Sequence, residues 1–139
     1  MIRALAAGVL ALVVPCGTAV ATTDKPEDLA QAAAESWLKI VDAGDYGTSW
    51  DETARLFQGA VTKEQWEQAA TAWRAPLGKV VSRKLKSRKF SKTLPGAPDG
   101  QYVVIQYDSH FEKKAVAVEN ITPMRDPDGA WRVAGYFIR

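Results

Sequence analysis

Two residue types that build many active sites are almost absent from this chain. It holds one cysteine, Cys16, and one histidine, His110. Zinc sites of the usual cysteine and histidine composition are therefore excluded, and no metal site is expected. A Ser-His-Asp arrangement has a single candidate centre, at His110. Gly-rich phosphate loops are also missing, so the sequence points to no cofactor.

Long apolar runs are missing as well, and the one short run predicts export. Residues 1–21 place Arg3 before an apolar run from Ala4 to Val14 and end in Ala19-Val20-Ala21. That run is about half of the roughly 20 residues that a membrane-spanning helix needs. The layout is typical of a secretory signal cleaved after Ala21. We expect an exported protein, periplasmic or secreted, with no transmembrane segment after cleavage.

Cleavage removes the only cysteine, so residues 22–139 can form neither a disulfide nor a thiolate nucleophile. A lipid-modified Cys16 is the weaker alternative, because Pro15 stands where such sites have a small residue. Hydrophobic residues make up 47% of the chain, which includes five tryptophans. This composition predicts a packed globule of one domain, residues 22–139.

Charge is divided among three blocks of the sequence. Residues 22–67 hold ten acids and four bases, residues 68–98 hold eight bases and no acid, and residues 99–139 hold six acids and five bases. The formal net charge of the whole chain is only +2. The overall balance therefore gives no reason to expect a polyanionic partner, although the middle block does.

The helical half of the domain is expected over residues 25–75. A helix over about 25–43 begins near Asp24, with Glu27 completing a capping-box-like start. A second helix is expected from Thr48 or Ser49 to Gly59. The third has the clearest start signal.

That third helix begins at Thr62, whose capping box is completed by Gln65, and ends before Pro76.

The sheet half is expected over residues 77–139, where the apolar period changes from helical to alternating. The first strand should contain a bulge or bend near Ser87. With "KK" and "PD" as two-residue hairpin tips, Asp108 falls opposite Glu119. In this register the helix-facing residues of the last two strands are Val116, Val118, Thr122, Met124, Trp131, Val133 and Phe137. The predicted fold is α+β: three helices packed on a bent four-stranded antiparallel meander.

Several segments together resemble a known family. "VDAGDYGTSWD", "VTKEQW", "RAPLGKVVSRKLKS", "LPGAPDGQYVVIQYDSHF" and "WRVAGYFIR" are similar to the small secreted bacterial family catalogued as domain of unknown function 4019. The resemblance covers about residues 30–139 and transfers no catalytic residue. It implies a cone-type fold, cystatin-like or nuclear transport factor 2-like. Such cones include isomerases and dehydratases as well as non-enzymatic binding modules, so function stays open.

One enzyme hypothesis can be built from the expected sheet. Asp108, His110, Glu119 and Tyr136 would share a face, where paired carboxylates and a histidine permit acid/base chemistry. The activity would be that of a cofactor-free isomerase or hydro-lyase acting on a small organic molecule. The alternative is that these residues form the solvent-exposed face of an antiparallel sheet.

Tryptophans give a second hypothesis. Trp37, Trp50, Trp66 and Trp73 could line a cavity for a small apolar or amphipathic ligand. Equally, helical spacing alone predicts that such residues fill the core.

The run "RKLKSRKFSK", residues 83–92, gives a third hypothesis. Lys84, Lys86, Arg88 and Lys89 are candidates for contact with an anionic surface. Nucleic acid is excluded as a partner by export and by the single aromatic residue in the run, Phe90. Pairing with the protein's own acids, or protection of a sheet edge, are the structural alternatives.

The sequence therefore favours an exported, non-enzymatic binding or protein-interaction module of the cell envelope, with an unknown small molecule or an envelope protein as partner. The acid/base enzyme is the alternative. A purely structural envelope protein is the third class, for which stable self-association through the last strand would be the sign.

Overall fold

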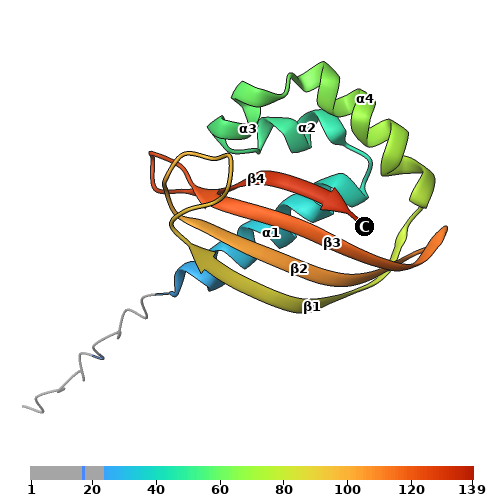
Figure 1. Cartoon of the computed structure of the whole chain (residues 1–139). Helices are drawn as coiled ribbons and strands as arrows, with labels where there is room; N and C mark the ends of the chain where they lie inside the picture. Colours follow the sequence, from blue (N-terminus) through green and yellow to red (C-terminus); the bar gives the residue numbers. More distant parts are fainter. Residues whose placement is uncertain (1–16, 18–23) are drawn as a thin grey trace, which may run out of the picture.

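The structure is a computed structural model that describes Gly17 and residues 24–139. Four α-helices and a short 3₁₀ helix precede four strands (Figure 1). The predicted signal segment and its cleavage site lie outside the described residues. Within the described part, no helix is both long and apolar enough to cross a membrane.

Helix α1, Pro26–Asp42, crosses one face of the sheet (Figure 1). Its buried residues follow helical spacing and are Ala30, Ala34, Trp37, Leu38 and Val41. The expected cap at Asp24 is wrong. Lys25 occupies the N-cap position without a side-chain hydrogen bond, and Pro26 begins the helix, where its missing N–H costs nothing.

The second expected helix is divided into two, so the structure has four α-helices where the sequence predicted three. These are α2, Tyr46–Asp51, and α3, Arg55–Ala60. The break occurs because the backbone at Thr53 and Ala54 is recruited by the last strand. Ala54 N–H donates to the carbonyl of Val133 at 2.8 Å, and Thr53 forms a parallel bridge to the same residue.

Helix α4, Lys63–Trp73, begins as predicted. The Thr62 hydroxyl accepts from Gln65 N–H, and the Gln65 side chain accepts from Thr62 N–H, which is a complete capping box. The 3₁₀ helix η1, Ala75–Leu77, follows, and Gly78 turns the chain into the sheet with a φ of 73°. Only glycine adopts this backbone conformation readily.

The sheet is antiparallel and its strands follow sequence order: β1, Val80–Ser91; β2, Tyr102–Phe111; β3, Lys114–Arg125; and β4, Trp131–Ile138. The α+β class and the four-stranded meander are thereby confirmed. The predicted irregularity near Ser87 is also confirmed, since the register shifts between Leu85 and Ser87. This bulge lets Arg83 before it and Arg88 after it both reach the face of the sheet that α1 covers.

The register expected for β2 and β3 is wrong by one residue. Tyr107 lies opposite Glu119, and Asp108 lies opposite Val118. The hairpin turns at Glu112 and Lys113, one residue earlier than expected, and a bulge between Ser109 and Phe111 restores part of the offset.

The slip in register reverses the faces of β3, because successive strand residues point to opposite sides. Val116 and Phe137, both expected under the helices, are 85% and 53% exposed. Ala117, Glu119 and Ile121 are buried in place of the predicted β3 residues.

The β3–β4 turn is also longer than predicted. Asp126 pairs with Ala130 around a three-residue tip that ends in Gly129, φ 87°. The longer turn and a register shift between Thr122 and Pro123 together place Ile138 opposite Glu119, where Tyr136 was expected.

A single hydrophobic core lies between the helices and the sheet. Trp37 and Leu38 of α1 and Trp66 of α4 pack with Ile105 of β2 and Ile121 of β3. We name the other side of the sheet, which none of the described helices covers, the outer face (Figure 1).

Candidate functional sites

A carboxylate is buried at the centre of the molecule. Glu119 of β3 has an exposed fraction of 0% and accepts hydrogen bonds from three neighbouring side chains. Arg83 Nε donates to Oε1 at 2.6 Å, and its Nη2 donates to Oε2 at 3.1 Å. Ser109 Oγ donates to Oε1 at 2.5 Å, and the Tyr136 hydroxyl donates to Oε2. All three other strands therefore contribute donors to Glu119.

Two further charged residues extend this cluster to the end of α1. Asp42 accepts from Arg83 Nη1 at 2.8 Å and from Arg74 Nη2 at 3.2 Å. Arg74 also donates to the carbonyl of Gly78 at 2.7 Å. We name the set Asp42, Arg74, Arg83, Ser109, Glu119 and Tyr136 the Glu119 cluster.

Two members of the cluster, Arg83 and Tyr136, have shifted pKa values. Burial opposes the charge of Arg83, but its hydrogen bonds to Asp42 and Glu119 raise the net pKa above the ordinary arginine value. Burial raises the pKa of Tyr136 well above its usual value, and the neighbouring Glu119 charge raises it further. The tyrosine is therefore a neutral donor at physiological pH.

The hydrogen bonds and charges of the Glu119 cluster indicate a structural role, in which it links the strands to the ends of the helices. Two guanidinium groups balance two carboxylates, and both Glu119 oxygens each accept two hydrogen bonds. Glu119 and Tyr136 line none of five pockets on the described part of the chain. A buried charge pair of this kind is destabilising when one partner is removed.

The four catalytic candidates divide between the two faces of the sheet. Glu119 and Tyr136 are hydrogen-bonded inside the molecule. Asp108 and His110 are exposed on the outer face, and the Asp108 side chain is 60% exposed. The structure therefore brings two of the four together, and the other two lie on the opposite side of the sheet.

Three of the four candidate tryptophans form one packed aromatic group. Ring centroids of Trp37 and Trp66 are 5.9 Å apart, as are those of Trp66 and Trp73. Tyr136 contacts this group, 5.1 Å from Trp37. Trp50 is partly buried and donates its indole N–H to the carbonyl of Val61 at 2.8 Å.

The hydrogen bonds of these side chains are mostly internal. Trp37 and Trp66 donate to the Ser49 carbonyl and hydroxyl, at 2.8 and 2.9 Å. Of the four, Trp37 alone lines a pocket among those found in the described residues.

The basic residues of β1 lie on both faces of the sheet. Arg83 belongs to the Glu119 cluster, and Arg88 donates to Asp28 of α1 at 2.7 Å. Lys86 Nζ lies 4.0 Å from Asp108 Oδ1. Lys84 and Lys89 are exposed and make no ion pair with the described residues.

Strand register places the side chains of the outer face in rows. Lys84, Asp108 and Val118 form one row, which Arg139 continues through backbone hydrogen bonds to Val118. The next row is polar and ends in an aromatic ring: Ser87, Gln106, Asn120 and Phe137. The outer face is therefore basic along β1 and apolar toward β4.

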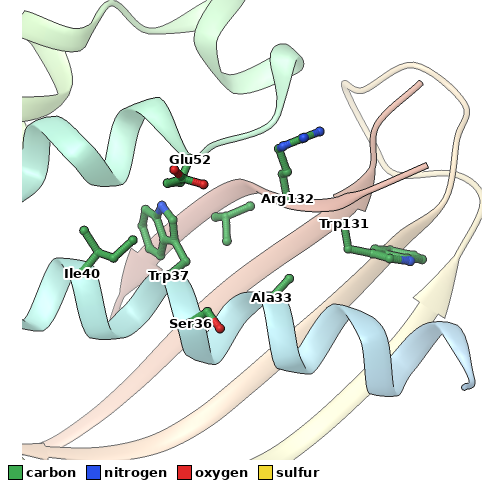
Figure 2. A pocket seen from close by; sticks show the side chains of 8 residues that line it. Ala33, Ser36, Trp37, Ile40, Glu52, Trp131 and Arg132 are labelled. Carbon is green, nitrogen blue, oxygen red and sulfur yellow. The ribbon is translucent and has the colours of Figure 1, made fainter. Parts of the chain in front are cut away.

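A pocket of about 170 Å³ lies between α1, the α2–α3 connection and the start of β4 (Figure 2). Trp37, Trp131, Glu52 and Arg132 line it, with Ala33 and Ser36 of α1 (Figure 2). Trp131 is the one tryptophan that the sequence analysis left out of the ligand candidates.

Several of these residues were missed by sequence reasoning. Arg83 was considered only as part of the basic run 83–92, although it shares strand parity with Leu85. Ser109 lies between the core residues Tyr107 and Phe111, and a polar residue at an apolar position was the available signal. Arg74 gave no comparable signal, since cations are favoured at helix C-termini. Asp42 is an acid at the C-terminus of α1, where the helix dipole disfavours it, and that position was an available signal.

Metal coordination has no obvious location in the part of the chain described. No group of three or more His, Cys, Asp or Glu side chains there is arranged to hold a metal ion.

Comparison with known proteins gives one finding. No curated protein matches this chain. The family described as "Protein of unknown function (DUF4019)" matches residues 33–136, which include most of α1, the Glu119 cluster and all but the last residues of the sheet. The chain belongs to this family of unknown function.

Proposed function

We propose that this chain is an exported, non-enzymatic interaction module of the cell envelope that binds an acidic segment of a partner protein on its outer face. The observation that carries the proposal is the placement of Lys84 and Lys89. Both are exposed on the outer face, and neither forms an ion pair with a described residue, although Asp108 lies opposite Lys84 in the strand register.

Charge on this face favours an acidic partner. Lys84, Lys86 and Lys89 lie along β1. Among the described residues, Asp108 is the carboxylate that pairs with one of them, with its Oδ1 4.0 Å from Lys86 Nζ. Charged groups at an interface rim steer a partner of opposite sign and fix its orientation.

Polar groups on the face favour a protein over a lipid surface. Ser87 donates to Gln106, and Gln106 donates to Asn120, which is buried. The accessible side chains of Ser87 and Gln106 can meet the amides of a peptide, whereas acyl chains offer them no partner. Exposed Phe137 and Val116 supply apolar contact beside them.

A groove on the same face could receive a side chain of the partner. It has a volume of about 400 Å³ and lies between β1, β2 and the loop that contains Thr93 and Leu94. Lys89, Val104 and Gln106 line it.

The acid/base enzyme has less support. Its four candidate residues lie on two faces of the sheet, and the Glu119 oxygens are occupied by internal donors.

A binding titration tests the proposal. A fluorescently labelled glutamate-rich peptide should bind the protein with an affinity that falls as salt rises. Lys84→Gln/Lys89→Gln should weaken binding about three- to tenfold, since exposed charge pairs contribute about 0.2–1 kcal/mol each. Lys25→Gln/Lys39→Gln is the matched control, because it makes the same charge change on the α1 side.

Equal loss in both double variants would mean that only net charge matters and would overturn the proposal. Binding to anionic vesicles without binding to the peptide would overturn the choice of partner. The expected export has its own check, since the exported protein should begin at Thr22 when its N-terminus is sequenced.

A further inference from the structure

The pocket in Figure 2 is separate from the outer face and has its own chemistry. We propose that it binds a small organic cation, an ammonium ion of about the size of choline.

Two indole rings belong to its lining. Trp37 of α1 and Trp131 of β4 both line the pocket, and in the view of Figure 2 the small side chains of Ala33 and Ser36 lie between them. Trp37 is fixed in place, since it is 3% exposed and donates its indole N–H to the Ser49 carbonyl. Indole faces attract ammonium groups more strongly than other aromatic side chains do.

The charges around the pocket leave an unmatched carboxylate. Glu52 is exposed on the pocket rim and forms no ion pair with any described residue. Its nearest opposite charge in the lining, Arg132, is already engaged. That guanidinium donates to Asp126 at 2.9 Å and to both oxygens of Asp128 at 2.8 and 2.9 Å.

The charges beside the pocket balance one another. Glu52, Asp126 and Asp128 carry three negative charges, while Arg132, Arg55, whose charge acts on Asp128, and Arg125, which lies opposite Trp131 in the sheet, carry three positive charges. Preference for a cation therefore depends on the unpaired Glu52 carboxylate and on the partly exposed indole ring of Trp131.

Volume limits the ligand to a small one. A cavity of about 150 Å³ is large enough for benzene, so a pocket of about 170 Å³ accepts a ligand of similar size. Choline fits this limit, whereas nucleotides and most drug-sized ligands, whose pockets span about 300–1,000 Å³, do not.

Titration with choline tests the proposal, with the indole N–H signals of Trp37 and Trp131 followed by NMR. Both signals should shift saturably, with a dissociation constant of about 1 mM. The uncharged isostere 3,3-dimethyl-1-butanol should bind at least about fivefold more weakly, because it lacks the cation–π attraction.

Variants assign the effect to residues. Glu52→Gln should weaken choline binding about fivefold, as should Trp131→Ala. Glu67→Gln, an exposed site on α4, is the matched control and should leave binding unchanged. Glu52→Gln keeps the size of the side chain, so it tests charge without a risk to folding.

Three results would each overturn the proposal. The first is equal affinity for choline and its neutral isostere, and the second is unchanged affinity in Glu52→Gln. The third is the absence of any saturable shift at choline concentrations of about 50 mM.

Discussion

At the scale of single residues, Glu119 is the position on which most of the interior depends. It is fully buried and bonded to Arg83, Ser109 and Tyr136, so each of the other three strands donates to one carboxylate. Charge, and not the size of the side chain, is what these donors require.

Replacing this charge should therefore be costly. Glu119→Gln keeps the shape but leaves Arg83 with Asp42 as its only counter-charge, so we expect a loss of about 3 kcal/mol in the free energy of unfolding. Urea denaturation measures this loss. Glu67→Gln, an exposed control on α4, should change stability by less than about 0.5 kcal/mol. A loss below about 1 kcal/mol in Glu119→Gln would show that the cluster does not depend on this charge.

The prediction that Glu119 and Tyr136 lie close together was correct, but the other residues predicted beside them were wrong. Both residues were predicted to share a sheet face with Asp108 and His110. That prediction depended on hairpin register, and a one-residue slip moves a whole strand to the other face. The local sequence does not determine whether a hairpin turns at Glu112–Lys113 or one residue later.

At the scale of secondary-structure elements, local signals predicted starts and irregularities better than pairing. The Thr62 capping box and the bulge near Ser87 were both predicted from a few adjacent residues. The division between α2 and α3 was not, because it depends on Val133, which is remote in sequence.

The β3–β4 turn allows a pH test. Hydrogen bonds from Arg132, then from the backbone N–H of Ala130, lower the pKa of Asp128 to about 2. Because the folded pKa lies below the unfolded value of about 3.9, any stabilisation from Asp128 is fully present above that value. It is lost as the pH falls toward 2.

The measurement is a carboxyl NMR titration of Asp128. The group should remain ionised at pH 3 in the unmodified protein. In Arg132→Gln its midpoint should rise toward the ordinary aspartate value, about 3.9. An identical midpoint in the variant would contradict the assigned cause of the shift.

At the scale of the whole molecule, composition and period were sufficient for the fold class, while the family was identified from the resemblance of several segments. Alternation of apolar residues after Pro76 predicted four strands, and helical spacing before Pro76 predicted the helical layer. In the structure, the strands and helices pack as one α+β unit around a shared core. What could not be predicted was which basic residues stay free. The bulge turns both Arg83 and Arg88 toward α1, where Arg83 pairs in the interior and Arg88 pairs with Asp28 at the surface, while Lys84 and Lys89 remain on the outer face.

The central claim is that this outer face recognises an acidic protein segment. Mapping backbone amide NMR signals during titration with a glutamate-rich peptide tests it most directly. We predict that the perturbed amides will concentrate on β1 and β2 around Lys84, Lys89 and Gln106, with α1 and α4 unaffected. Perturbations centred on the helices, or spread evenly over every exposed lysine, would contradict the account.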